Sequence, residues 1–305
     1  MSINFEYYKI FYYAAKYKNI TRAAAAMGSS QPNVTRILKL LEAELNCKLF
    51  VREARGITLT EEGERLYAHV ETAVMQLQNA QEELTAQASD GIGTVEIGAT
   101  ETALHVFLLN ALHSFKEDHP RVRIKIHNHT TPEILQKLTY GRLDFAVLTT
   151  PFTLQKSLVS SNLATFYEIL AAGRQYQQLG QRRWTICELR QYPWVGLGSG
   201  TATYDYYKKY FLQHCADIEL DTEAASSDLL IPLIRNNFGI GFIPEMMARP
   251  LLKEQVLVQI PLNCKLPERR LCLVYDKGRG RSIVSWELQK YLKSIKHLGT
   301  DSSLG

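Results

Sequence analysis

Apolar positions at helical spacing predict three helices near the start of the chain. The first spans 5–16, where aromatic and alanine side chains recur on one face. Thr21 is a candidate N-cap for a second helix, which is rich in alanine and ends at Gly28. Ser30 is a candidate N-cap for the third, and Pro32 lies in its first turn, where a missing N–H is harmless. The tight turn between the second and third helices predicts a helix-turn-helix.

The third helix combines an apolar face with a polar N-terminal surface. Its apolar side chains are Val34, Ile37, Leu38 and Leu41. The residues near its start, mostly off that face, are Ser30, Gln31, Pro32, Asn33, Thr35 and Arg36. In a major groove, Asn and Gln pair with adenine and Arg pairs with guanine, so this surface fits a recognition helix. Two packed helices of an ordinary α domain, with polar residues facing water, fit the spacing equally well.

The segment 51–59 is typical of the wing of a winged helix-turn-helix. Arg52 and Arg55 flank a predicted turn at Gly56, and a short β-branched strand follows. Arginines in such a loop reach phosphates or the narrow minor groove. We expect Arg22, in the second helix, to contact the DNA backbone in the same way. The alternative is that these arginines simply face water.

A long helix is predicted to begin at Thr60, with acidic residues in its first turn, where the helix dipole favours them. No Gly or Pro interrupts 64–89. Apolar residues recur at alternating spacings of four and three, the pattern of a two-helix coiled-coil seam. These residues are Leu66, Val70, Ala73, Leu77, Ala80 and Leu84. An amphipathic helix packed on its own domain is the alternative, but the strict seam favours self-association.

After a break at 89–93, short apolar runs alternate with helical stretches. Strands expected at 95–99, 122–126 and 145–148, with helices at 102–116 and 132–140, predict a parallel sheet covered by helices on both faces. The second half repeats this order. Its expected strands are 166–171, 194–197, 240–243, 256–260 and 271–275, and its expected helices are 204–214, 228–237 and 282–295.

Charge separates the N-terminal module from the rest of the chain. Residues 1–60 contain nine Lys or Arg and four acidic residues, a balance of +5, whereas the whole chain carries +4 and 61–305 therefore carries about −1. A basic module on a near-neutral body predicts a polyanionic partner for that module alone, although a solvated basic face would have the same charge. The hydrophobic fraction of 46% is that of a globular protein.

The N-terminus and the cysteines favour a cytoplasmic protein. The first residues lack the basic start and apolar core of an export signal, and no apolar run approaches the ~18 residues of a membrane span. The five cysteines are scattered without metal-ligand spacing, which predicts reduced thiols. The alternative is a redox switch that pairs Cys187 or Cys215 with another thiol.

The N-terminal segment 4–63 resembles the DNA-binding domain of the LysR-type transcriptional regulators. The matching residues are Phe11, Thr21-Arg22-Ala23-Ala24, Ser30-Gln31-Pro32-Asn33-Val34-Thr35, Leu41-Glu42, Leu45, Leu49-Phe50, Arg52, Leu59-Thr60 and Gly63. Two positions depart from the family pattern. Thr35 replaces the usual serine and keeps its hydroxyl, and Asn46 replaces glycine but tolerates a left-handed turn.

The remaining chain, to about residue 297, resembles the effector domain of the same family, which has the fold of periplasmic binding proteins. The matching pieces are Val95-Glu96-Ile97-Gly98, His119-Pro120, Gly141-Arg142-Leu143-Asp144, Gly239-Ile240-Gly241-Phe242-Ile243-Pro244 and Pro261-Leu262. The resemblance implies an α/β protein with an N-terminal all-α winged helix-turn-helix. It divides the chain into a DNA-binding domain (1–59), a linker helix (60–90) and a two-lobed effector domain (91–305). Lobe I would comprise about 91–162 and 268–305, and lobe II about 163–267, with crossovers near 150–165 and 263–270.

The resemblance also implies partners. The linker helix pairs two chains in this family, and effector-domain contacts commonly make a tetramer. The remaining partners would be double-stranded promoter DNA, a small-molecule effector and RNA polymerase. We expect no membrane partner.

Ligands of two-lobed α/β folds bind at the carboxyl ends of strands, between the lobes. The residues at those ends are Thr100, Glu101, Thr102, Asn128, His129, Thr130, Thr149, Ser199, Thr201 and Phe242. Hydroxyls at helix starts predict a small anionic metabolite, because helix N-termini favour negative charge. The same residues would also serve as ordinary N-caps, and Glu101 opposes a strongly anionic ligand unless it points away.

Patterns typical of enzymes are missing from the sequence. The glycine-rich stretch 196–200 is neither a P-loop nor a dinucleotide fingerprint, and no GxSxG elbow occurs. His127 and His129 alternate on an expected strand without a third ligand. We therefore predict no catalytic residue, metal or cofactor. The alternative is a cytoplasmic α/β small-molecule-binding protein or enzyme with an accessory helical domain, which would not retard genomic DNA fragments in a gel.

Overall fold

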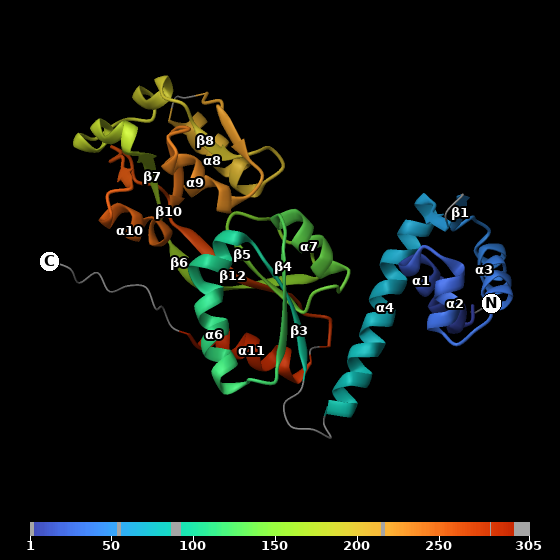
Figure 1. The fold of residues 1–305 in the computed structure, drawn as a ribbon. Coiled ribbons are helices and arrows are strands. Elements are labelled where there is room, and N and C mark those ends of the chain that lie inside the picture. Colours follow the sequence, from blue (N-terminus) through green and yellow to red (C-terminus); the bar gives the residue numbers. More distant parts are fainter. Residues whose placement is uncertain (1–2, 54–55, 87–92, 215–216, 281, 296–305) are drawn as a thin grey trace. The chain divides into compact units, whose positions relative to one another are not determined.

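The computed structural model describes residues 3–53, 56–86, 93–214, 217–280 and 282–295. Its internal contacts divide the chain into two units, one formed by Met1–Ala88 with Tyr140–Arg142 and the other by Ser89–Thr139 with Leu143–Gly305. The first unit is mainly helical, and the second contains two lobes, each built on a β-sheet covered by helices (Figure 1).

The first unit packs three helices, a hairpin and the start of a long helix around one core. The elements are α1 (Phe5–Tyr17), α2 (Ile20–Ala26), α3 (Gln31–Leu45), the antiparallel strands β1 (Phe50–Glu53) and β2 (Gly56–Leu59), and α4 (Glu61–Ala86). The core joins Phe11 of α1, Leu41 of α3 and Val70 of α4. Gly63 lets α4 approach closely, because a Cβ there would lie 2.2 Å from the carbonyl oxygen of Leu49.

Helix ends agree with the sequence at most positions but not at the start of α2. Asn19 is the N-cap, and its side chain accepts a hydrogen bond from the Arg22 N–H at 3.0 Å. Thr21 therefore lies in the first turn, because an equally good capping residue stands two positions earlier. Gly28 has the expected left-handed backbone, with φ of 61°. Gly56 pairs with Glu53 as the first residue of β2, so it starts the second strand of the wing.

The first lobe of the second unit is a five-stranded sheet in the order β4–β3–β5–β12–β6. Its strands are β3 (Thr94–Ala99), β4 (Arg123–Asn128), β5 (Phe145–Thr149), β6 (Leu158–Phe166) and β12 (Arg269–Asp276). β3 pairs in parallel with β4 and β5, which confirms the predicted order. β12 runs antiparallel to β5 and β6, because it enters this sheet from the second lobe.

Helices cover both faces of this sheet, as predicted (Figure 1). One helical stretch consists of α5 (Glu101–Ala103), a π-helical turn η1 (Leu104–Leu108) and α6 (Leu109–Asp118); the others are α7 (Thr131–Thr139) and α11 (Ile283–Ser294). Side chains alternate along β5, so Val147 packs with α6 and α11 whereas Leu148 packs with α7.

The second lobe does not repeat the expected parallel order, because its main sheet, β10–β7–β11, is antiparallel and only the pair β8–β9 is parallel. The strands are β7 (Glu168–Gly173), β8 (Val195–Leu197), β9 (Thr222–Ala224), β10 (Gly241–Pro244) and β11 (Leu257–Gln259). The helices are η2 (Arg174–Gln181), η3 (Glu188–Gln191), α8 (Ala202–Gln213), η4 (Ser227–Leu229), α9 (Leu230–Arg235) and α10 (Glu245–Lys253). β7 is buried on both faces, with Leu170 in one core and Ile169 in the other.

Several elements of the second unit lie outside the ranges expected from the sequence, namely β6, η2, η3, β9 and α10. β6 occupies the second half of the segment near 150–165 that the family resemblance assigns to a crossover, and it forms an edge strand of the first sheet. The passage to β7 is instead the single residue Tyr167. α10 contains Pro250 in its interior, where proline is usually unfavourable in a helix.

One cysteine differs from the expectation of reduced thiols. Cys187 is disulfide-bonded, whereas Cys47, Cys264 and Cys272 are free. Cys215, the other cysteine of the predicted redox switch, lies outside the described residues. Folding brings the Cys187 Sγ to 3.1 Å from the carbonyl oxygen of His214, an approach that a separation of 27 residues does not reveal. None of the helices in the described ranges is both long and apolar enough to traverse a bilayer.

Candidate functional site

The start of α3 presents a preorganised polar surface. Ser30 caps the helix as predicted, and its Oγ accepts a hydrogen bond from the Asn33 N–H at 3.4 Å. The Asn33 side chain is held from two sides, because it donates to the Ser29 Oγ at 3.1 Å and accepts from Arg36 Nη2 at 3.1 Å. Arg36 and Asn33 therefore act as one hydrogen-bonding pair on the surface of the helix.

The other predicted DNA-contacting residues lie on α2, on α3 and in the hairpin. Gln31 and Pro32 are exposed on the first turn of α3, and Thr35 is half-buried. Arg22 is exposed on α2. Arg52 lies in β1 of the hairpin, whereas Arg55 falls outside the described residues.

The predicted seam of α4 divides into two parts. Leu66 packs on the core of its own unit, and Val70 is buried there with only 6% exposure, because this part of α4 crosses α1. These two side chains therefore stabilise the module itself, and Val70 is not presented to a second helix. Farther along, Ala73, Leu77 and Ala80 are exposed, and nothing is described for the side chain of Leu84.

A cavity of about 190 Å³ lies between the two lobes of the second unit, at the carboxyl ends of β3, β4 and β5. The predicted residues that line it are Thr100, Glu101, Thr102, Asn128, His129, Thr130, Thr149 and Thr201. Parallel strands bring these sequence-distant residues to one edge of the sheet. Ser199 is not among the lining residues, and Phe242 lines a neighbouring cavity. Sequence reasoning missed Thr131, Glu133, Leu197, Ala202, Thr203, Ala225, Ser226 and Ser227.

Both carboxylates of this inter-lobe cleft already accept hydrogen bonds. Glu133 Oε2 accepts from the Thr130 hydroxyl at 2.8 Å and from its N–H at 3.0 Å, and these bonds lower the pKa of the Glu133 carboxyl. Glu101 Oε2 accepts from the N–H of Asp228 at 3.2 Å and so joins the two lobes. The buried Thr100 Oγ1, in contrast, has no hydrogen-bond partner among the described residues. The cleft therefore retains a polar group that a ligand could satisfy.

His127 and His129 do not converge on a common ligand position. His127 Nε2 lies 2.5 Å from a Glu96 carboxylate oxygen, and the Lys137 Nζ lies 2.5 Å from His129 Nε2. No group of three or more His, Cys, Asp or Glu with metal-site geometry occurs in the ranges that the structure describes.

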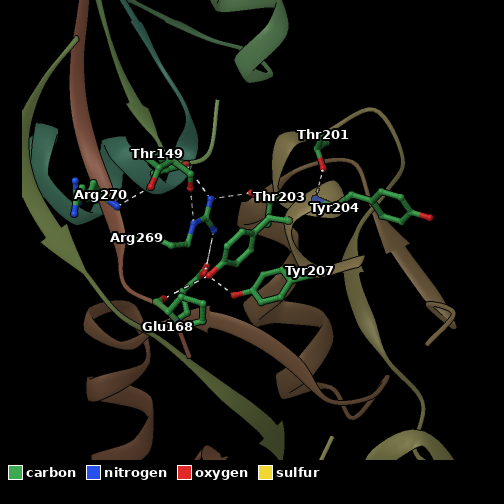
Figure 2. Close-up of polar contacts among 11 residues, drawn as sticks. Thr149, Glu168, Thr201, Thr203, Tyr204, Tyr207, Arg269 and Arg270 are labelled. Atoms are coloured by element: carbon green, nitrogen blue, oxygen red, sulfur yellow. Dashed lines mark hydrogen bonds and ion pairs between the residues drawn. The ribbon is translucent and has the colours of Figure 1, made fainter. Parts of the chain in front are cut away.

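Arg269 connects the two lobes through hydrogen bonds to Glu168 and to Thr149, which lines the inter-lobe cleft (Figure 2). Arg269 was not predicted from the sequence as a site residue. Its Nη1 donates to both oxygens of Glu168 at 3.0 Å, and its Nη2 donates to the Thr149 and Thr203 hydroxyls at 3.3 and 3.1 Å. Its Nε donates to the Thr150 carbonyl oxygen at 2.8 Å. The guanidinium is thus bonded to β5 of the first lobe, to β7 and to α8 of the second.

Burial and neighbouring charge shift the pKa values of Arg269 and Tyr207 in this cluster. Arg269 is 2% exposed, and although burial opposes its charge, the Glu168 carboxylate raises the pKa of the guanidinium. Burial, together with Glu168, raises the pKa of Tyr207 well above its ordinary value. The Tyr207 hydroxyl therefore keeps its proton and donates it to Glu168 in a hydrogen bond (Figure 2). The sequence signal for this cluster is a charged residue at the start of a buried strand, Glu168 in β7 and Arg269 in β12.

Two protein-family models match the chain. The model described as "Bacterial regulatory helix-turn-helix protein, lysR family" matches residues 5–64, and the model "LysR substrate binding domain" matches residues 88–294. The HTH-type transcriptional regulator CysB of Burkholderia cenocepacia is 24% identical over 233 residues, covering 76% of this chain and 74% of that protein. The HTH-type transcriptional regulator YofA of Bacillus velezensis is 25% identical over 288 residues, covering 94% and 96%.

Solved structures share the fold over nearly the whole chain. ArgP from Mycobacterium tuberculosis superposes with a TM-score of 0.73 at 16% identity, covering 96% of this chain and 97% of that one. Full-length CbnR complexed with its target DNA gives a TM-score of 0.69 at 17% identity, with coverage of 95% and 99%.

Proposed function

Because the chain belongs to the LysR family of transcriptional regulators, we propose that α3 reads promoter DNA and that a small anionic metabolite in the inter-lobe cleft controls this binding. The observation that carries the DNA assignment is the mutually bonded pair at the start of α3, in which Arg36 is exposed and Asn33 is half-buried. A recognition helix contacts base edges with its N-terminal residues. The CbnR structure, of similar fold, was solved in complex with its target DNA. A DNA-binding role also favours a cytoplasmic location and, as the family implies, contact with RNA polymerase.

Arg36→Ala should weaken binding to the preferred DNA site by about 1–3 kcal/mol and relax preference at one base pair, because a bidentate arginine–guanine contact is lost. The preferred site is first selected from random duplexes with the parent protein. Fluorescence anisotropy then measures binding to that duplex and to single-base variants.

The matched control is Arg22→Ala, which removes an exposed arginine of α2. We expect it to weaken all duplexes alike and to reduce the salt dependence by about one phosphate contact. If Arg36→Ala behaved in the same way, Arg36 would contact the backbone and our orientation of α3 would be wrong.

We also propose that the exposed half of α4 pairs with a second copy of the chain. Ala73, Leu77 and Ala80 follow one another at the seam spacing and are all exposed, and the last two lie beyond the part of the helix that Leu66, Val70 and Val74 anchor. Pairing through this segment places two DNA-binding modules in one particle. A dimer implies a partly palindromic site, and further contacts between effector domains would make a tetramer.

The effector proposal rests on the chemistry of the inter-lobe cleft. Its lining is rich in hydroxyls and contains neither Lys nor Arg, so an anion would be held by hydroxyl and backbone N–H groups at the starts of helices. Thr100 Oγ1 has no hydrogen-bond partner there among the residues that the structure describes. The engagement of Glu101 and Glu133 with backbone N–H groups reduces their opposition to a negative ligand.

Thr102→Val should remove the response to the effector and leave folding and basal DNA binding unchanged, because the substitution replaces one hydroxyl in the cleft with a methyl group of similar size. The control is Thr153→Val, at an exposed loop position that lines neither cavity. Calorimetry with the full-length protein is run across organic acids, amino acids and inorganic anions. If none of them bound, the anionic-effector proposal would be wrong, whereas the DNA-binding proposal would stand.

A further inference from the structure

A second and larger cavity, of about 420 Å³, lies in the second lobe next to the inter-lobe cleft. Thr102, Leu197, Thr203 and Ser227 line both spaces, so the two adjoin. Its volume is within the range of small-molecule sites in proteins. The function proposed above does not use this cavity.

The inner wall of the cavity is aromatic. Tyr207 and Phe242 stack with ring centroids 4.4 Å apart and planes 4° from parallel, and Trp194 and Phe211 pack edge to face at 4.9 Å. Leu220 and other aliphatic side chains complete this part of the lining. Such a wall favours the flat apolar body of a ligand.

The buried charges at one end of the cavity are already compensated. Arg269 donates both to Glu168 and to neighbouring threonine hydroxyls, and Tyr207 donates to Glu168 (Figure 2). This cluster therefore needs no charged ligand group, and the charge preference of the cavity depends on its other residues.

The remaining charged lining residues are exposed and mostly acidic. Asp217, Glu219 and Glu223 come from the segment that includes β9, and Lys208 comes from α8. Within the described part of the chain, none of these three carboxylates forms an ion pair. An apolar cavity with unpaired carboxylates at its entrance complements a molecule that has an apolar body and a cationic end.

We propose that this cavity binds a hydrophobic organic cation, an amine or ammonium compound with an aromatic body, as a second ligand distinct from the one in the inter-lobe cleft. The aromatic body would lie against Tyr207 and Phe242, and the cationic group would face Glu219 and Glu223. Because Thr102 and Thr203 line both spaces, occupancy of this cavity would also alter the neighbouring cleft.

The test uses two probes that share one ring system and differ in charge. Tryptamine carries an ammonium group, and indole-3-propionate carries a carboxylate on a similar chain. In calorimetry with the full-length protein at low ionic strength and neutral pH, we expect saturable binding of tryptamine and binding of indole-3-propionate weaker by at least about tenfold. Raising the salt concentration to about 0.3 M should weaken tryptamine binding, because the entrance carboxylates are exposed.

Two variants locate the site. Leu220→Trp fills the cavity and should abolish tryptamine binding, whereas Leu212→Trp, at a 58% exposed position of α8 that does not line the cavity, should leave it unchanged. The double variant Glu219→Gln with Glu223→Gln should weaken binding by about 3–20-fold, as expected for two exposed charge pairs. This surface variant also decides the question if Leu220→Trp fails to fold.

The proposal is overturned by any one of three results. The first is that tryptamine does not bind the parent protein, and the second is that indole-3-propionate binds as tightly as tryptamine. The third is that both the folded Leu220→Trp protein and the double glutamine variant bind tryptamine with the affinity of the parent.

Discussion

Leu77→Glu is expected to convert the protein to monomers and to lower its affinity for a palindromic DNA site by about 10²–10⁴-fold, because the second module no longer binds at a high effective concentration. Leu77 is 50% exposed in the free half of α4. In a two-fold pair, the new carboxylate would be desolvated near its own symmetry mate, so the seam would not form. Folding should survive, because the core of the module is formed by α1–α3 and the first half of α4.

The control for this variant is Gln78→Glu, which adds the same charge one residue along the helix at another exposed position. Sedimentation velocity gives the oligomeric state, and anisotropy at fixed salt gives the affinity. A dimer that persisted in Leu77→Glu would place the interface elsewhere and refute our assignment of the α4 seam.

Arg269→Met should lower the free energy of unfolding of the second unit by about 3–5 kcal/mol, because it leaves the Glu168 carboxylate buried without its cation. Urea unfolding of the intact chain, followed by tryptophan fluorescence, measures this loss. All three tryptophans, Trp184, Trp194 and Trp286, lie in the second unit, so their emission reports on that unit.

The neighbouring residue supplies a matched control. Arg270 Nη2 pairs with Glu268 at 3.3 Å, but both side chains are about half exposed. Arg270→Met should therefore cost at most about 1 kcal/mol. The double variant Arg269→Met with Glu168→Leu should recover much of the lost stability, because no unpaired charge remains. Equal effects of the two single variants would contradict the importance of the buried pair.

Local sequence signals predicted the features that depend on a few neighbouring residues. Ser30 and Pro32 mark the start of α3 because capping and ring geometry act within one turn. Threonines of the cleft lining, such as Thr100 and Thr149, could be predicted because parallel strands align their carboxyl ends at one edge of the sheet. A correct order of strands along the chain is enough to apply this rule.

Features that depend on distant contacts were missed or only partly predicted. Arg269 bonds to Glu168, 101 residues away, and no local pattern indicates that pairing. The regular spacing that predicted the α4 seam cannot distinguish packing on α1 from pairing with a second chain. Val70 therefore fits the pattern, although it is buried in its own module.

Strand β12 also determines the order in which the second unit can assemble during synthesis. Its residue Arg270 bonds to Thr150, which is 120 residues earlier, and it lies between β5 and β6 in the sheet. The contiguous segment from β7 to β11 leaves the ribosome before β12 does, so the second lobe can complete its sheet while the first lobe still lacks a central strand. Strand pairs so distant in sequence form slowly. A nascent chain that stops before Arg269 would hold open edges on β5 and β6, the kind of surface that chaperones protect from aggregation.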